Sequence, residues 1–320
     1  MIRPALAILC LAAAAGLPAR AGTVFVASQQ AGQLSRIEAA AVAGQASVPA
    51  VSVPAAPATV AAGGGLVFLT HPDGHAITVA EAATGRVLRR LPYAGQAFGL
   101  AAGADGRHLF VADWSGHRVD RIAAADGRVE ASAETGRDPA HLVLDRAGRL
   151  FVADRESRQV SVFDAARMVR VATIPVGEAP FALALSPDED RLYVGNVRSN
   201  DLTVIDTGTL TARATVPAGG MPYGVAVSPD GARVLVTNQH AGTVTVLDAG
   251  TLRVAATVGV GRYPEGIAIS DGRAYVANWF SDDVSVIDLA TLKPVARLPV
   301  AEGPRSLAVA AGAVSEGETR

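Results

Sequence analysis

A repeat with a period of 40 to 42 residues constrains this chain more than any other feature of its sequence. The clearest copy runs from Pro222 to Val260 and contains four short apolar runs, GVAVS, RVLVTN, TVTVLD and RVAATV. Runs rich in valine and threonine are typical of β-strands. The gaps between them carry the Asp-Gly and Asn residues of tight hairpin turns. Each copy is therefore expected to form a four-stranded antiparallel meander, which cannot bury both of its faces alone.

The same pattern begins seven times along the chain. Its copies start at Pro57, Ala97, Pro139, Pro180, Pro222, Pro264 and Pro304. A fixed period in the low forties, with four strands in each unit, is the signature of a β-propeller, in which sheets are arranged as blades around an axis. The first copy is the least regular, because Ala61 to Gly65 replaces the Ser-Pro-Asp-Gly turn of later copies.

The two ends of the chain supply complementary parts of one unit. Residues 23–28 match a second strand, residues 32–38 a third and roughly residues 45–53 a fourth, while the missing first strand is found at residues 303–312. Strand pairing between the two ends would close the ring and leave no open seam. We therefore predict an all-β fold, a seven-bladed β-propeller of four-stranded antiparallel blades that spans residues 22–314.

Residues outside the predicted propeller resemble an export signal and a short tail. Residues 1–21 have a charged start at Arg3, an apolar stretch and an Ala-Arg-Ala cleavage site, as a secretory signal peptide does. Residues 315–320 form a polar tail. We therefore expect a periplasmic or extracellular protein, and we predict a monomer.

The composition of the exported part excludes several kinds of chemistry. The single cysteine, Cys10, lies within the predicted signal peptide, so the remaining 299 residues have no thiol for a disulfide or a thiolate metal site. Removing residues 1–21 lowers the basic count from 28 to 26 against 30 acidic residues, which gives a net charge of −4. That balance predicts no strong binding to nucleic acid or to a membrane surface. We also expect no cofactor.

Motifs in the last three complete copies are similar to those of a known family. LYVGN, VLVTN and AYVAN each precede a strand that ends in V-[I/L]-D, and together they resemble the YVTN β-propeller repeat family. The copies at Ala97 and Pro139 resemble NHL-type repeats instead, with Asp113 and Asp154 where later copies have asparagine. The resemblance implies an exported propeller of a group that includes proteins associated with PQQ-dependent catabolism and chains of quinoprotein amine dehydrogenases. It implies no particular activity, because such scaffolds host many functions.

The meander topology predicts which loops share one rim of the ring. The loop that enters each first strand and the loop that follows each second strand lie on the same side. Together they contribute both tryptophans and several of the other aromatic residues, including Phe98. Aromatic and arginine side chains on one surface are typical of a binding face. The alternative is that these rings only pack neighbouring loops. The candidate binding rim comprises Trp114, Arg155, Phe181, Tyr223, Glu265, Trp279, Phe280 and Arg305.

Two further sets of polar residues are candidates for function. Asp or Asn ends most second strands, either to line the axial mouth or, as we favour, to cap the turn that follows. His141 stands where later copies have glycine, in the innermost strand of its blade. With Asp113 and Asp154 it could hold a divalent ion or shuttle a proton. The alternative is a histidine that is hydrogen-bonded to a structural aspartate.

These observations favour an exported, non-catalytic binding or scaffold protein whose rim docks a protein or a small-molecule ligand. The family resemblance adds an accessory role in a periplasmic quinoprotein or redox system. The rival function is that of an enzyme, a metal-assisted lactonase or lyase centred on His141, Asp113 and Asp154.

Overall fold

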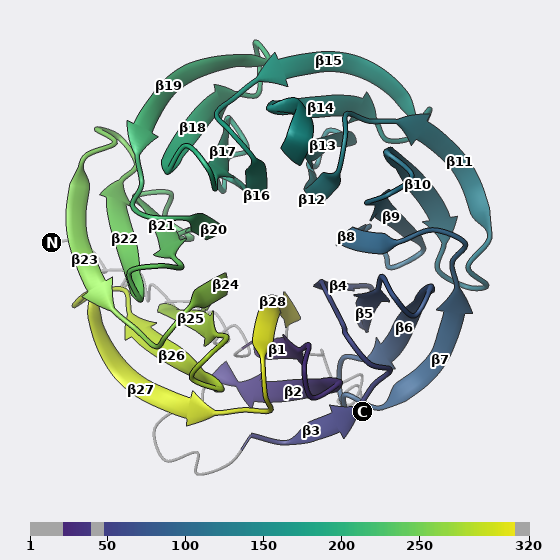
Figure 1. Ribbon diagram of the computed structural model, residues 1–320, viewed down its shortest axis with the longest axis horizontal. Helices are drawn as coiled ribbons and strands as arrows, with labels where there is room; N and C mark the ends of the chain where they lie inside the picture. Colours follow the sequence, from purple (N-terminus) through teal and green to yellow (C-terminus); the bar gives the residue numbers. More distant parts are fainter. Residues whose placement is uncertain (1–21, 40–47, 311–320) are drawn as a thin grey trace, which may run out of the picture.

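Seven antiparallel sheets of four strands each form a closed ring in the computed structural model, which describes residues 22–39 and 48–310 (Figure 1). The predicted seven-bladed β-propeller is confirmed. The predicted signal peptide, the tail at 315–320 and the propeller's last residues after Ala310 lie outside the described residues. No helix in the described part of the chain is long and apolar enough to span a bilayer.

The first three complete blades follow the chain in order, each starting at the axis. Blade 1 contains β4 (Val60–Gly63), β5 (Leu66–His71), β6 (Ala76–Glu81) and β7 (Val87–Pro92). Blade 2 contains β8 (Ala97–Ala102), β9 (His108–Asp113), β10 (Arg118–Ala123) and β11 (Val129–Glu134). Blade 3 contains β12 (Pro139–Leu144), β13 (Arg149–Asp154), the 3₁₀ turn η2 (Arg155–Ser157), β14 (Gln159–Asp164) and β15 (Val169–Pro175).

The next three blades repeat this order with almost the same strand lengths. Blade 4 contains β16 (Pro180–Leu185), β17 (Arg191–Asn196), β18 (Asp201–Asp206) and β19 (Thr211–Pro217). Blade 5 contains β20 (Pro222–Val227), β21 (Arg233–Asn238), β22 (Thr243–Asp248) and β23 (Val254–Gly259). Blade 6 contains β24 (Pro264–Ser270), β25 (Arg273–Asn278), β26 (Asp283–Asp288) and β27 (Lys293–Pro299).

Blade 7 is shared between the two ends of the chain, as predicted. It contains β28 (Pro304–Ala310), β1 (Thr23–Ser28), β2 (Gln33–Glu38) and β3 (Ala50–Ser52). β28 pairs with β1 in antiparallel register from Thr23 opposite Ala310 to Ser28 opposite Pro304. The most C-terminal of the described strands, β28, therefore completes the sheet that contains the most N-terminal one, β1, and Figure 1 shows the two side by side. This pairing holds the ring closed by backbone hydrogen bonds.

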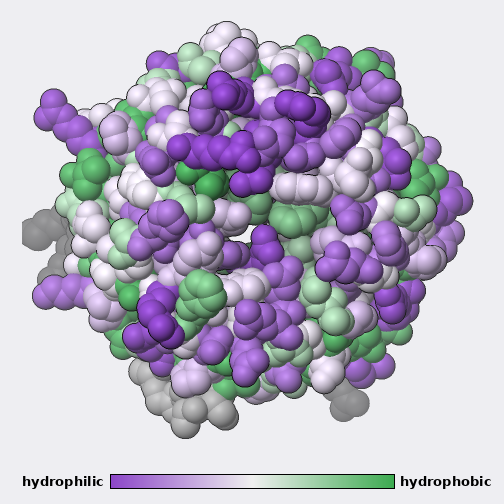
Figure 2. Space-filling model, in the orientation of Figure 1, coloured by the Kyte–Doolittle hydropathy of each residue, from purple (hydrophilic) through white to green (hydrophobic). Residues whose placement is uncertain are grey.

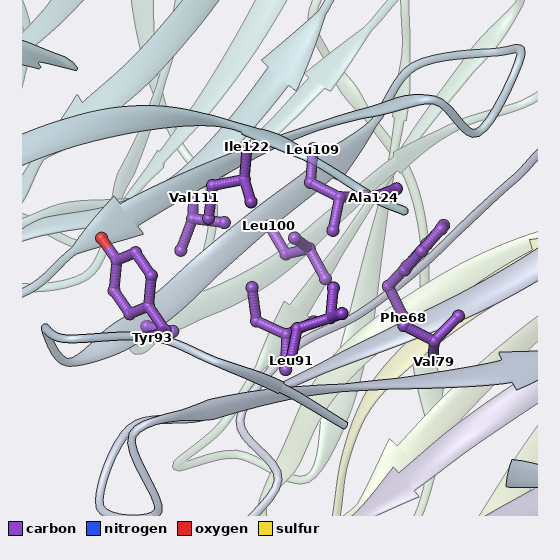
Figure 3. Close-up of a cluster of buried hydrophobic side chains, with 11 residues drawn as sticks. Phe68, Val79, Leu91, Tyr93, Leu100, Leu109, Val111, Ile122 and Ala124 are labelled. Atoms are coloured by element: carbon purple, nitrogen blue, oxygen red, sulfur yellow. The ribbon is translucent and has the colours of Figure 1, made fainter. Parts of the chain in front are cut away.

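Hydrophobic side chains fill the spaces between adjacent blades. The second strand of each blade is buried on both faces, because alternate side chains point to the two neighbouring blades. Figure 3 shows the cluster between blades 1 and 2, in which Phe68 and Leu91 meet Leu109 and Ile122. Fully burying one such side chain contributes about 1.5–3 kcal/mol, so the seven interfaces together carry most of the stability of the ring.

Arginines add a repeated link between blades on one rim, where each second strand begins. Arg191 donates from Nη1 to the carbonyl of Ala249 in the next blade at 2.6 Å, and Arg273 donates to the carbonyl of Ala39 at 2.8 Å. Arg149 and Arg233 make the equivalent bonds to Thr207 and Leu289. This rim lies opposite the ends of the second strands, and we refer to it as the turn rim.

Candidate functional site at the axial mouth

The polar residues that end the second strands cap the loops of the other rim. Asp113 accepts hydrogen bonds from the backbone N–H groups of Gln96 at 2.9 Å and Gly116 at 3.1 Å. Asn278 accepts one from Gly261 N–H at 3.1 Å and donates to Asp283 and Ser285. The favoured interpretation of these residues as turn caps is confirmed for Asp113 and Asn278. In blades 2 and 6 this cap holds the end of the second strand against the loop that enters the first strand. Asn196 and Asn238 instead donate to side chains of the third strand, and their Oδ1 atoms accept no hydrogen bond.

The rim loops converge on the axis, where the first strands begin. Each blade places one residue here, directly after the start of its copy of the repeat. These seven residues form a ring that we call the mouth ring, and in chain order they are Ala58, Phe98, Ala140, Phe181, Tyr223, Glu265 and Arg305.

Aromatic members of the mouth ring form one continuous wall. The ring centroids of Phe181 and Tyr223, from neighbouring blades 4 and 5, lie 4.4 Å apart. The rings of Phe98 and Phe181 lie 5.9 Å apart in an edge-on arrangement, although blade 3 stands between their blades. Blade 3 contributes only Ala140 at this position, and its small side chain leaves the space in which the two rings meet. Such pairs contribute about 0.5–1.5 kcal/mol beyond the area they bury.

Two arginines lie against this aromatic wall. The guanidinium carbon of Arg305 is 5.3 Å from the ring centroid of Phe98 and 5.8 Å from that of Trp279. Arg305 belongs to blade 7 and reaches past blade 1, which contributes only Ala58 to the mouth ring. Arg155 lies 5.9 Å from the centroid of Trp114, whose ring packs on Phe98 at 4.7 Å. Both contacts are within the range of cation–π attraction.

A buried carboxylate faces Arg305. Glu265 is 6 % exposed, and its Oε1 accepts a hydrogen bond from Gln239 Nε2 at 2.9 Å. Its Oε2 lies 3.3 Å from Arg305 Nε but accepts no hydrogen bond. Burial raises the pKa of Glu265 to about 7, and the attraction of Arg305 and the bond from Gln239 only partly oppose this rise. The carboxyl group is therefore poised to gain or lose a proton near neutral pH.

These side chains surround a cavity at the mouth of the axial channel. It has an empty volume of about 600 Å³, counted to include its opening to solvent. Its lining includes Phe181, Tyr223, Glu265, Arg305 and His141. Figure 2 shows a narrow opening at the centre of the molecule with hydrophilic residues beside it. A concave site with an apolar wall and a few convergent polar groups is typical of ligand binding.

His141 lines this cavity but does not form the predicted metal site. Its Nδ1 is buried and has no hydrogen-bond partner, and burial lowers its pKa to about 4, so the ring is neutral at physiological pH. Asp154 accepts hydrogen bonds from Ser161 at 2.6 Å and Gln159 at 2.9 Å, and Asp113 pairs with Arg118. Across residues 22–39 and 48–310, no three His, Cys, Asp or Glu side chains are grouped so that they could hold a metal ion.

The rival hypothesis that His141 joins Asp113 and Asp154 in a metal centre is therefore not supported by the described residues. The alternative, a hydrogen bond from His141 to a structural aspartate, is not found either, because His141 Nδ1 has no hydrogen-bond partner. What the sequence did indicate correctly is that a large residue at this position is exceptional. Gly224 and Gly99 occupy it in other blades, where an added Cβ would lie 2.3 and 1.9 Å from the carbonyl oxygen of the next blade.

Most of the predicted rim residues meet at the mouth, and one stands apart. Phe280 packs on Tyr263 at 4.8 Å and remains 52 % exposed. Sequence reasoning missed Gln239, whose side chain is hydrogen-bonded to Glu265. It placed Phe98 on the rim but did not include it in the candidate binding rim, although Phe98 contacts both Trp114 and Phe181. A polar residue directly after Asn238, which ends β21, was the available signal for Gln239, but the same position is variable in other blades.

Comparisons with known proteins agree with the fold. The family model described as YNCE-like beta-propeller matches residues 182–274, under a third of the chain. The chain is a β-propeller. No curated protein sequence matches it. Among solved structures, a protein of unknown function from Desulfotomaculum acetoxidans is similar with a TM-score of 0.78 at 15 % identity, covering 90 % of this chain and 98 % of that one. Hydrazine synthase from Kuenenia stuttgartiensis is similar with a TM-score of 0.70 at 20 % identity, covering 79 % of this chain and 89 % of that one.

Proposed function

We propose that this propeller works by binding, and that its ligand or partner docks at the axial mouth. The observation that carries the proposal is the Oε2 of Glu265, which faces Arg305 at 3.3 Å but accepts no hydrogen bond. The side chain is almost entirely withdrawn from water yet lies in the wall of an open cavity. Leaving a buried polar atom without a hydrogen bond costs about 1–3 kcal/mol, and a ligand that supplies the bond recovers that cost.

The aromatic wall supports the same conclusion. If the rings only packed neighbouring loops, they would need no charged groups between them. Here Arg305 lies against two rings and beside Glu265, so planar, apolar and charged surfaces meet in one cavity. This combination is that of a binding hot spot, in which aromatic and arginine side chains predominate.

The finer parts of the proposal concern compartment and partner. Residues 1–21 support export to the periplasm, and the repeat motifs support an accessory role beside a quinoprotein or redox system. Cleavage after Ala21 is expected to leave Gly22 as the first residue. Mass spectrometry of the protein recovered from the periplasm tests this, and an uncleaved cytoplasmic product would contradict it.

The docking face is testable by fluorescence, because Trp114 and Trp279 are the only tryptophans of the chain. Fractions of a periplasmic extract are added to the protein while intrinsic fluorescence and the melting temperature are recorded. A ligand of the mouth is expected to change the emission and to raise Tm, since binding to the folded state alone stabilises it.

The double variant Trp114→Ala/Trp279→Ala identifies the surface. With the active fraction it is expected to keep its fold but to lose the rise in Tm. Arg213→Gln is the matched control, because Arg213 pairs with Asp206 on the turn rim and touches none of the mouth residues. A double variant that is stabilised as much as the unmodified protein would show that docking occurs elsewhere.

A further inference from the structure

The axial cavity has a charge and a shape that restrict what it can hold. One side is the aromatic wall of Phe98, Phe181 and Tyr223, whose neighbouring rings are inclined to one another, and the other side is the Glu265–Arg305 pair. The rest of the lining includes the small residues Ala182, Gly224 and Gly266 and the polar residues Thr59 and Ser306. A flat molecule can therefore lie on the wall with one edge directed at Arg305.

Two arginine side chains, Arg305 and Arg155, act on the wall at Tyr223. Burial raises the pKa of the Tyr223 hydroxyl, and Glu265 raises it further, whereas Arg305 and Arg155 both act in the opposite direction. Two guanidinium groups from blades 7 and 3 thus act on one point of the wall. Arg155 also has a buried Nε with no hydrogen-bond partner. The two arginines therefore attract negative charge at this point of the wall, and burial and Glu265 oppose it.

Glu265 is the one acid at this point, and its surroundings do not keep it ionised. The groups that face it are Arg305 on β28, Tyr223 on β20 and Gln239 after β21. His141, which also lines the cavity, is neutral and offers no compensating charge. When Glu265 is protonated, Arg305 loses its ionic partner and is free to pair with another anion, and the Glu265 hydroxyl can donate a hydrogen bond to it.

We propose that the axial cavity binds a small planar anion, in class an aromatic carboxylate, whose ring packs on Phe181 and Tyr223 and whose carboxylate replaces Glu265 as the partner of Arg305 while Glu265 takes up a proton from solvent. This inference rests on the proposed function and gives the site a ligand class. An arylalkylamine such as benzylamine fits the wall equally well but would place its ammonium group beside Arg305, and like charges oppose each other there.

Isothermal titration with benzoate tests the proposal, with benzylamine as a probe of the same shape and opposite charge and acetate as an anion without a ring. Benzoate is expected to bind saturably with a Kd of about 1 mM or tighter, and acetate and benzylamine at least tenfold more weakly. At pH 8, titrations in two buffers of different ionisation enthalpy are expected to reveal uptake of about one proton per benzoate. At pH 5.5 Glu265 is already protonated, and the uptake should vanish.

Variants separate the roles of the two charged residues. Arg305→Met is expected to weaken benzoate binding at least tenfold, whereas Arg305→Lys keeps the charge and retains part of the affinity. Glu265→Gln is expected to bind benzoate with no proton uptake at any pH. Arg198→Gln is the control, because this exposed arginine of the same rim pairs with Glu156 outside the cavity lining. Thermal melts of every variant confirm that it is folded.

The result can overturn the ligand class without overturning the binding face. Benzylamine binding as tightly as benzoate, benzoate binding unchanged in Arg305→Met, or no saturable benzoate binding up to about 10 mM would each refute the planar anion. If the tryptophan-dependent rise in Tm from an extract fraction persists in any of these cases, the mouth remains the docking face and only its ligand class is wrong. If that rise is also absent, both proposals fail.

Discussion

The two rims of this propeller use the repeat in opposite ways. On the turn rim the same device recurs from blade to blade: Ser186 bonds Asp188, Ser228 bonds Asp230, and an arginine reaches the next blade. At the axial mouth the equivalent residue differs in almost every blade, and only alanine and phenylalanine occur twice. The comparison teaches that positions where the copies agree maintain the ring, whereas positions where they diverge are available for binding. Four substitutions test how far that division holds.

The largest effect is expected inside the axial channel, one residue further along the first strands. An added Cβ at Gly99 would lie 1.9 Å from the carbonyl oxygen of Ala140, and backbone cannot move aside cheaply. Gly99→Ala should therefore lower the free energy of unfolding by about 3 kcal/mol or more. Gly259→Ala is the control, because an added Cβ there meets nothing within 4 Å. Equal denaturation midpoints for the two variants would show that the blades can separate at the axis.

Glu265→Gln is expected to change the pH dependence of stability. The pKa of Glu265 is raised from 4.5 to about 7 in the folded protein, so the folded state holds the proton more tightly than the unfolded state. Ionisation therefore costs stability, which falls as the pH rises from about 4.5 to beyond 7, by about 3 kcal/mol in all. The glutamine variant lacks this loss. Relative to the unmodified protein it should gain stability progressively in urea denaturation between pH 5 and pH 8.

This difference between the two proteins isolates Glu265 from the other titrating groups. His141 is present in both, and the loss of stability that its lowered pKa causes below pH 6.5 cancels in the comparison. A constant difference at every pH would mean that Glu265 is ionised throughout. The mouth would then be built for stability in the same way as the turn rim.

A smaller effect is expected on the turn rim. Arg191→Gln removes the hydrogen bond to the carbonyl of Ala249, which joins blades 4 and 5, and should lower the free energy of unfolding by about 2 kcal/mol. Arg253→Gln removes an exposed arginine from the next turn and should change it by less than about 0.5 kcal/mol. Benzoate binding should be unaffected in both. Weakened binding in Arg191→Gln would mean that the two rims are coupled through the blades.

The smallest effect on stability is expected at Phe280, which packs on Tyr263 but is half exposed. Phe280→Ala should lower the free energy of unfolding by less than about 1 kcal/mol. The same variant also tests how far the docking face extends. An active extract fraction is added to it, and the resulting rise in Tm is compared with that of the unmodified protein. Loss of that rise would extend the face outward from the cavity to the loop after β25, and an unchanged rise would confine it to the cavity.

The fold could be predicted in detail because its information is local and repeated. Turn residues, apolar alternation and the period recur together, so each blade reinforces the assignment of the others. The complementary ends of the chain predicted the shared blade down to the pairing of β28 with β1. The capping role of Asp113 and Asn278 followed for the same reason, since a cap bonds residues close to it in sequence or in the adjacent loop.

The candidate site could be predicted only in part. The meander topology placed Trp114, Tyr223 and Arg305 on one rim, but it gave no account of which side chains touch. The rival hypothesis for His141 failed for the same reason, because Asp113 and Asp154 lie near it in the topology but the described side chains do not group around a metal position.

The sequence by itself determined a ring of seven blades and the rim on which its divergent residues lie, because strand period and turn chemistry are properties of neighbouring residues. Only the tertiary structure decided that Ala58 and Ala140 leave gaps across which Arg305 and Phe181 reach Phe98. It alone decided that Glu265 is buried beside that contact with one oxygen unbonded. The contacts of Phe98 with Arg305 and Phe181 depend on the small side chains of Ala58 and Ala140 in the blades between them. A pattern within a single repeat carries no information about residues in other blades.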